Sequence, residues 1–305
     1  MKIKIEILTI LFGMAVLCRG YANNLIENQP LKPVLTFDTT AQNVQYEPAT
    51  GNYRVYYDDY KGIGKFWIFK PANKILMYVN AKCTPVAGTK KYKYVYEISN
   101  GKNSKQNIWS FAIEYKKSLT NIISPENWHY GYFSYKSVID WNGELSAGKS
   151  IKGFSFESEV IPGIVECYGD GYTEPHVFSN YESEIAEDTR PPLPDFFGNC
   201  VVGKTIGPDI IPLPPVITPI SLIKRLITLK EESFKLGWID NRGIANSLNK
   251  KLENTKDAVN RGQNETAKNI LNAFINEVES QRGKHINDNA YYLLKTNAEF
   301  IVSKL

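Results

Sequence analysis

Two adjacent acids, Asp58 and Asp59 in the run Tyr56-Tyr-Asp-Asp-Tyr60, are the first residues of this chain that could take part in chemistry. Paired carboxylates serve glycoside hydrolysis, in which one acts as an acid and the other as a base or nucleophile across the scissile bond. Neighbouring side chains of an extended strand point to opposite faces, so these two carboxylates would not converge on one bond. We therefore favour a solvated hairpin for this segment.

A second group of polar residues follows Cys167. Asp170, Glu174 and His176 lie close together in sequence, and Gly169-Asp-Gly171 is expected to form a tight turn. Carboxylate and imidazole ligands of this kind could hold Ca²⁺ or a transition metal. The spacing of a calcium loop is absent, however, so a structural loop is favoured over a metal site. No G-x-S-x-G, H-E-x-x-H or P-loop motif occurs either, so we assign no catalytic residue and expect no cofactor.

Aromatic residues offer a different chemistry, because exposed Tyr and Trp faces can stack on sugar rings. The chain has 19 Tyr and 5 Trp, nearly all before residue 200. The rings that we single out as a binding surface are Tyr57, Tyr60, Trp67, Trp128, Tyr130 and Tyr132. Packing within a sheet is the competing interpretation for any one ring, since Tyr is a good strand residue.

The N-terminus is typical of an exported protein. Lys2 and Lys4 precede an apolar run from Ile7 to Leu17, and Gly20-Tyr-Ala22 supplies small residues for a signal peptidase. The run is too short to span ~30 Å of hydrocarbon, so residues 1–22 are predicted to be a removed signal peptide. Lipidation of Cys18 is the alternative, although Leu17 is large for the position before it. We expect a secreted protein, at the cell surface or in the medium, with the periplasm also open.

Composition narrows the class of partner. The hydrophobic fraction is 43%, the charged fraction 22% and the net charge +4, all ordinary for a globular protein. No basic block argues for nucleic acid or an anionic membrane surface, and no second apolar segment offers a membrane span. Without Cys18, three cysteines remain, and we favour a disulfide between Cys167 and Cys200 across an irregular loop. A Cys83–Cys167 pairing stays open.

Residues 33–206 carry strand patterns. Tyr92, Tyr94, Tyr96 and Ile98 alternate with mostly charged residues, and a second alternating run extends from Ile108 to Tyr115. Further strands are expected at Phe66–Phe69, Ile75–Val79, Ser134–Trp141 and Ile151–Val160. Short strands without intervening amphipathic helices predict an antiparallel β-sandwich. The run from Ile151 to Ser158, with Trp141 before it and Pro162-Gly163 after it, resembles immunoglobulin-like sandwich domains of exported bacterial proteins.

The remainder of the chain divides into a linker and helices. Residues 207–220 lie in a proline-rich stretch that predicts a semi-rigid spacer. Residues 221–305 contain four amphipathic patterns, which end at Gly237, Gly262 and Gly283 and at the C-terminus. Asp240 or Asn241, Asn264, and Asn287 or Asp288 are the expected N-caps of the second, third and fourth helices. Short connections predict an up-and-down bundle, so the fold class is all-β followed by all-α.

The helical segment resembles the FIMAH domain of secreted bacterial proteins. The resemblance covers about 80 residues and rests on Asp240-Asn-Arg-Gly-Ile244, Gly262-Gln263, Phe274-Ile275 and His285-Ile286, with apolar spacing between them. At the motif that names the family only Phe274-Ile275 agree, since Asn276-Glu-Val278 replace Met-Ala-His. The family implies an accessory or interaction module rather than a catalyst.

Two functions follow from these patterns, and a structural protein of an envelope or matrix, with no small ligand, stays open as a third. The favoured hypothesis is a non-enzymatic exported protein, in which the β domain binds a glycan or an extracellular protein and the helices serve as an accessory module. The alternative is a secreted polysaccharide hydrolase with its site in the β domain. Two carboxylates about 5–10 Å apart in one cleft would favour the hydrolase, whereas a flat exposed row of rings would favour binding.

Overall fold

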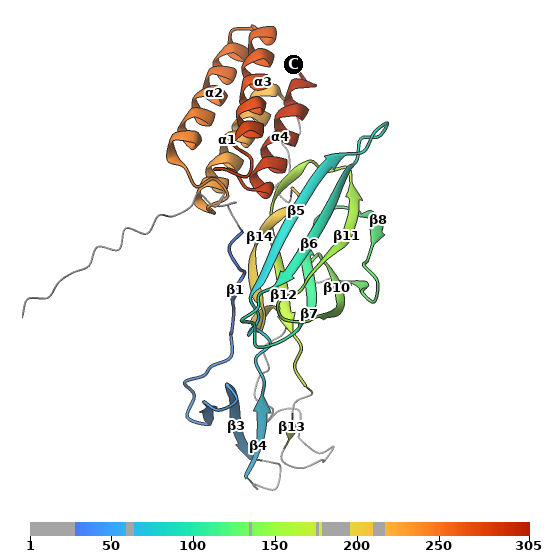
Figure 1. Cartoon of the computed structure of the whole chain (residues 1–305), viewed down its shortest axis with the longest axis vertical. Helices are drawn as coiled ribbons and strands as arrows, with labels where there is room; N and C mark the ends of the chain where they lie inside the picture. The colour runs from blue at the N-terminus through green and yellow to red at the C-terminus, as the bar shows by residue number, and fades with distance from the viewer. Residues whose placement is uncertain (1–27, 59–63, 134–135, 175–176, 179–195, 210–216) are drawn as a thin grey trace, which may run out of the picture.

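The computed structural model describes residues 28–58, 64–133, 136–174, 177–178, 196–209 and 217–305. Antiparallel sheets form the N-terminal part and four helices the C-terminal part, which confirms the predicted all-β then all-α order. Figure 1 shows the helices at one end of the β-sandwich and a small third sheet at the other. The predicted signal peptide, 1–22, lies outside the described residues.

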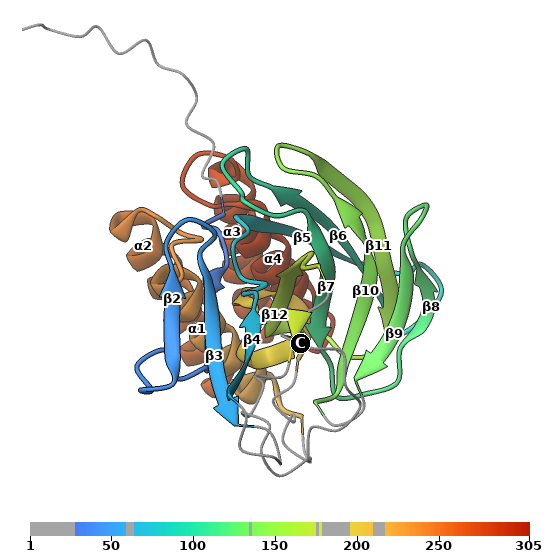
Figure 2. The same cartoon turned by 90° about the horizontal axis from the view of Figure 1, so that it is seen from below.

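Two sheets pack face to face to make the sandwich (Figure 2). The larger has the strand order β1 (Lys32–Pro33), β14 (Val201–Pro208), β12 (Pro162–Gly171), β7 (Ile108–Glu114), β10 (Val138–Leu145), β9 (His129–Phe133). The smaller has the order β5 (Met77–Pro85), β6 (Tyr92–Asn100), β11 (Ser150–Ser158), β8 (Thr120–Ile123). The alternation predicted for Tyr92 to Ile98 is confirmed, because alternate residues of β6 are buried. An immunoglobulin-like topology stays a prediction.

Aromatic rings fill the space between the two sheets. Trp141 stacks on Phe111 with ring centroids 5.7 Å apart, and Trp128 meets Phe154 edge-on at 5.0 Å. Gly143 lies directly beneath Trp128, where a Cβ atom would come within 2.3 Å of the indole. Rings that pair in this way contribute beyond their buried area, so most aromatics of this domain serve packing.

A third sheet, which the sequence patterns did not predict as separate, has its own core. It consists of β13 (Val177–Phe178), β4 (Gly64–Phe69), β3 (Asn52–Asp58) and β2 (Val44–Glu47). Val55, Trp67 and Phe69 form its buried centre, and Phe37 stacks on Phe69 at 4.7 Å. This cluster is separate from the main core.

The helices are α1 (Pro219–Lys235), α2 (Arg242–Asn260), α3 (Asn264–Gln281) and α4 (Asp288–Val302). Asn241 and Asn287 cap α2 and α4, as predicted, by accepting hydrogen bonds from the amides of Ile244 and Ala290. The prediction for Asn264 is wrong, because it is the first residue of α3 and the preceding Gln263 makes no side-chain cap. The three predicted stop glycines all have φ of 71° or 72°, which favours glycine.

The helical bundle packs directly on the β domain. Strand β5 is the edge of its sheet, and an unpaired edge would expose backbone hydrogen-bonding groups. From α4, Asn289 Oδ1 accepts a hydrogen bond from the Ala81 amide at 3.0 Å, and Thr296 donates to the Cys83 carbonyl. Residues 28–31 complete the cover, because the Leu31 amide and the Asn28 side chain donate to the carbonyls of Met77 and Val79.

The junction between the domains is shorter than the predicted linker of residues 207–220. Strand β14 continues to Pro208, and α1 begins at Pro219. Asp209, which follows β14, is buried and accepts two hydrogen bonds of 2.8 Å from the Arg225 guanidinium of α1. The two domains are therefore held together by a buried ion pair as well as by α4.

The predicted disulfide between Cys167 and Cys200 is wrong. Both residues and Cys83 are buried, and within the described residues no disulfide joins any two of them. Cys167 lies in strand β12 opposite Gly203 with its side chain in the sandwich core, whereas Cys200 precedes Val201 and projects from the other face of the sheet. The two sulfur atoms are thus separated by the sheet itself. The alternative pairing with Cys83 is not formed either, and burial raises the pKa of the Cys83 and Cys167 thiols far above the usual value.

Candidate functional site

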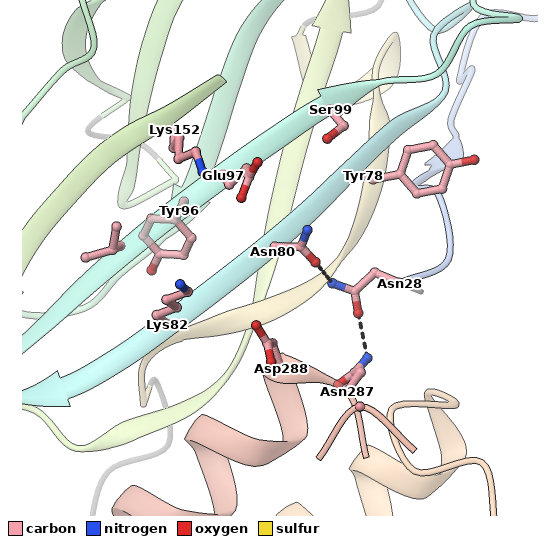
Figure 3. A pocket seen from close by; sticks show the side chains of 12 residues that line it. Asn28, Tyr78, Asn80, Lys82, Tyr96, Glu97, Ser99, Lys152, Asn287 and Asp288 are labelled. Carbon is pink, nitrogen blue, oxygen red and sulfur yellow. Dashed lines mark hydrogen bonds between the residues drawn. The ribbon is translucent and has the colours of Figure 1, made fainter. Parts of the chain in front are cut away.

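A cleft of about 500 Å³ lies where the outer face of the smaller sheet meets the start of α4 (Figure 3). Strands β5, β6 and β11 form one wall, and residues 283–288 form the other. The polar residues that line it include Asn28, Tyr78, Asn80, Lys82, Glu97, Ser99, Lys152, Asn287 and Asp288. Along β5 and β6, residues that fill the core alternate with residues that point outward. The polar residues that these two strands contribute to the cleft are the outward ones.

A chain of amide groups crosses the cleft from the sheet to the bundle. Asn28 donates to Asn80 Oδ1 at 2.7 Å and accepts from the Asn287 amide at 2.6 Å, as the dashed lines of Figure 3 show. Asn287 also caps α4 and Asn28 also covers the edge of β5, so both are fixed by the fold. The cleft therefore has a rigid polar floor built from three segments that are distant in sequence.

Charged groups of both signs surround this floor. Lys82, Glu97 and Lys152 form no ion pair within the described part of the chain, whereas Asp288 binds the Arg282 guanidinium at 2.8 Å. Arg282 in turn lies over the rings of Tyr291 and Tyr292. The hydrogen bond from Arg282 to Asp288 raises the pKa of the guanidinium further above its usual range.

Amides, carboxylates, ammonium groups and the Tyr78 ring together suit a ligand rich in hydroxyl groups. Such side chains donate and accept hydrogen bonds at fixed positions, and the Tyr78 ring adds an apolar surface. The two carboxylates of the cleft do not resemble an acid–base pair, because Asp288 is already bound to Arg282 and Glu97 lies on the opposite wall. The arrangement can bind and orient a ligand.

The rings predicted to bind a ligand are placed very differently from one another. Trp67 and Trp128 are 1% and 3% exposed, so the prediction for these two is wrong. Both faces of each ring are covered by neighbouring residues of its core. Tyr57 is half-buried against the small third core. Tyr60 lies outside the described residues.

Tyr130 and Tyr132 are half exposed on the edge strand β9. Their rings meet at 84° with centroids 6.1 Å apart, so they do not form a flat row. A binding role for this pair stays a prediction.

The first acidic candidates do not form a site. Asp58 is exposed at the end of β3, and Asp59 lies outside the described residues. Glu174 is exposed and pairs with Lys70 at 2.9 Å. His176 also lies outside the described part of the chain. Within that part, no group of three or more His, Cys, Asp or Glu side chains could hold a metal ion.

Asp170 is the exception, although the turn predicted around it is wrong. Residues 169–171 belong to strand β12, and Asp170 pairs in register with Ser110 of β7. On the other side of β7, Asp140 of β10 pairs with Ala112, so both carboxylates project from the same outer face of the larger sheet. Burial raises the pKa of Asp170 to about 7, and the charge of Asp140 adds to this shift.

Burial also raises the pKa of Asp140, although a hydrogen bond from Asn142 opposes the shift. Asp140 is 4% exposed, and Ser110 between the two acids is 3% exposed. The two acids are separated by two strand spacings, about 10 Å in total, and are also offset by two residues along β7. Sequence inspection missed Asp140, because its partner lies thirty positions away on a strand that is not its neighbour.

An antiparallel β domain with a packed C-terminal four-helix module is the class that the fold defines. Residues 224–303 match the family model of the FIMAH domain, which confirms the resemblance predicted for the helical segment. No curated protein matches the chain. Among the described residues, no helix is long and apolar enough to cross a membrane.

Proposed function

We propose that this chain is an exported, non-enzymatic recognition protein that binds a glycan in the cleft between its β domain and its FIMAH module. The observation that carries the proposal is the amide floor of Asn80, Asn28 and Asn287, which both domains build. Three charged side chains of the cleft that have no ion pair within the described residues surround it. A preformed site that needs no reordering loses little entropy on binding. In this proposal the FIMAH module supplies one wall of the binding site.

The test is retention of the full chain on insoluble polysaccharides and peptidoglycan, with the supernatant assayed for released sugar. We expect retention without release. Replacing Glu97 and Lys152 together by Ala should weaken retention about tenfold, since each removes a charged hydrogen-bonding group from the cleft.

A matched control comes from the same two strands. Lys93 and Glu157 lie opposite each other on β6 and β11, on the same outer face but outside the cleft. The double change Lys93→Ala with Glu157→Ala removes the same charge types from the same strands and should leave retention unchanged. An equal loss of retention in both double variants would show that the cleft is not the binding site. A protein ligand is indicated if no polysaccharide retains the chain.

Polysaccharide hydrolysis is the second candidate function, and the Asp140–Asp170 pair is the observation that favours it. A carboxyl group with a pKa near 7 can act as a general acid at neutral pH, and a second carboxylate on the same face could serve as the base. Release of sugar that Asp170→Asn abolishes, while retention persists, would establish this activity. Release that persists in Asp170→Asn would place catalysis elsewhere.

A further inference from the structure

We infer that the chain carries a second binding site, for a ligand with clustered oxyanion groups, at Lys91, Lys116 and Lys117. These lysines line a basin of about 530 Å³ that also includes Ser118, Thr120, Ser158, Glu159 and Val160. None of these residues lines the cleft of the proposed function. The inference is therefore independent of that function.

The basin lies where the chain crosses twice between the two sheets of the sandwich. Residues 115–119 lead from β7 of the larger sheet to β8 of the smaller one, and residues 159–161 lead from β11 back to β12. Lys116 and Lys117 belong to the first crossing, and Glu159 to the second. Lys91 immediately precedes β6, so three separate segments bring their side chains to one place.

The charge of the basin is unbalanced. None of the three lysines has an acidic partner within ion-pair distance in the described ranges, and the carboxylate of Glu159 is not paired there either. Three ammonium groups against one carboxylate leave a formal charge of +2 (3 − 1). Like charges gathered in one concavity repel each other, and a bound anion removes that repulsion.

The floor beneath these charges is fixed by the fold. Ser158 is 2% exposed and accepts a hydrogen bond from the Val160 amide, while the Tyr94 hydroxyl in the core donates to the Val160 carbonyl at 2.6 Å. The ammonium group of half-buried Lys91 donates a hydrogen bond of 3.1 Å to the Thr120 hydroxyl. The basin is therefore a shaped concavity with an anchored lysine, in which the exposed Ser118 hydroxyl can add a hydrogen bond to an oxyanion.

The chemistry favours an anion with several oxygens and more than one charge. Lysine ammonium groups bind phosphate and carboxylate as point charges, so the basin selects charge density rather than a planar shape. A phosphate-bearing ligand and a uronic acid polymer share this chemistry.

The experiment is calorimetric titration of the full chain at low ionic strength with sodium tripolyphosphate and, separately, with oligogalacturonate. We expect saturable binding of at least one probe. The triple change to Gln at Lys91, Lys116 and Lys117 should weaken it by about tenfold or more, and salt should weaken it in the intact chain. Glu159→Gln should strengthen it about threefold, because it removes the opposing charge.

A charge-matched control separates the basin from general attraction. Lys224, Lys235 and Lys250 are exposed on helices α1 and α2 and form no ion pair within the described residues, so their triple change to Gln removes the same charge. This control should bind as the unaltered chain does. Binding of tripolyphosphate alone would identify a phosphate ligand, and binding of oligogalacturonate alone a carboxylate ligand. Equal losses in the two triple variants, or no saturable binding of either probe, would overturn the inference.

Discussion

Asp170 links the folding of the larger sheet to the protonation of a single carboxyl group. Its carboxyl oxygen Oδ1 is buried and has no hydrogen-bond partner among the described residues, and burial raises the pKa of this carboxyl group from 3.8 to about 7. An unfolded chain would release this proton near pH 4, whereas the folded chain keeps it until pH is near 7. Between these values the folded state binds more protons, so stability falls as pH rises through the window.

The prediction for Asp170→Asn concerns the pH dependence of unfolding. The amide cannot ionise, so the free energy of unfolding of the variant should not decline between about pH 4 and pH 7. Above that window it should exceed the value of the unaltered chain by up to about 4 kcal/mol. Urea unfolding at pH 5 and pH 8, compared between the two chains, measures the effect. If the difference in unfolding free energy between the two chains were the same at both pH values, Asp170 would not be protonated in the folded state.

The glycines near Asp170 explain why sequence inspection misread this segment. Gly169 and Gly171 predict a turn, yet they lie in β12 with negative φ. A Cβ atom at Gly169 would come within 2.2 Å of the Met77 sulfur, and one at Gly171 within 2.5 Å of Gln106. These glycines permit close approach of neighbouring side chains. Spacing along one sequence does not distinguish that role from a turn.

At the scale of elements, the helices were predictable and the sites were not. Apolar spacing and the stops at Gly237, Gly262 and Gly283 are local signals, because both depend on residues within a few positions of each other. The cleft joins Asn28, Asn80 and Asn287, and the basin joins Lys91 to Lys117. Both depend on which strands become neighbours, and one sequence does not contain that information.

The ion pair between Arg225 and Asp209 provides a prediction at the same scale. The side chain of Asp209 is 1% exposed, and α1 supplies Arg225 as its bidentate partner. Arg225→Met removes the counter-charge that α1 supplies to this buried carboxylate and should destabilise the chain by about 3–5 kcal/mol. Urea unfolding at pH 7 measures the loss.

The double variant Arg225→Met with Asp209→Asn is the control, because it removes both charges together. We expect it to be more stable than the single variant, since no unpaired charge remains buried. A loss below about 1 kcal/mol in the single variant would show that the pair does not couple α1 to β14.

At the scale of the whole molecule, the FIMAH module completes the β domain. Four groups on the free edge of β5 have partners from outside the sheet, two from α4 and two from residues 28–31. The main core is continuous, because buried residues of the bundle and of the sandwich belong to one cluster. Edge strands otherwise invite pairing with other chains, and here helix α4 occupies the edge. The two domains should consequently unfold together.

Replacing the amides of α4 that reach the β domain tests this coupling. Asn289 accepts from the Ala81 amide, and Asn297 donates to the Pro162 carbonyl at 2.9 Å. Changing both to Leu leaves two buried backbone groups without partners, at a cost of about 1–3 kcal/mol each. Thermal unfolding can be followed by tryptophan fluorescence, which reports mainly on the β domain, and by circular dichroism of the helices. The two transitions should coincide in the unaltered chain and separate in the variant.

The control is Asn272→Leu, at an exposed position of α3, which should leave the two transitions coincident. Transitions that already differ in the unaltered chain would show that the module is an appendage, and glycan binding in a shared cleft would then lose its structural basis.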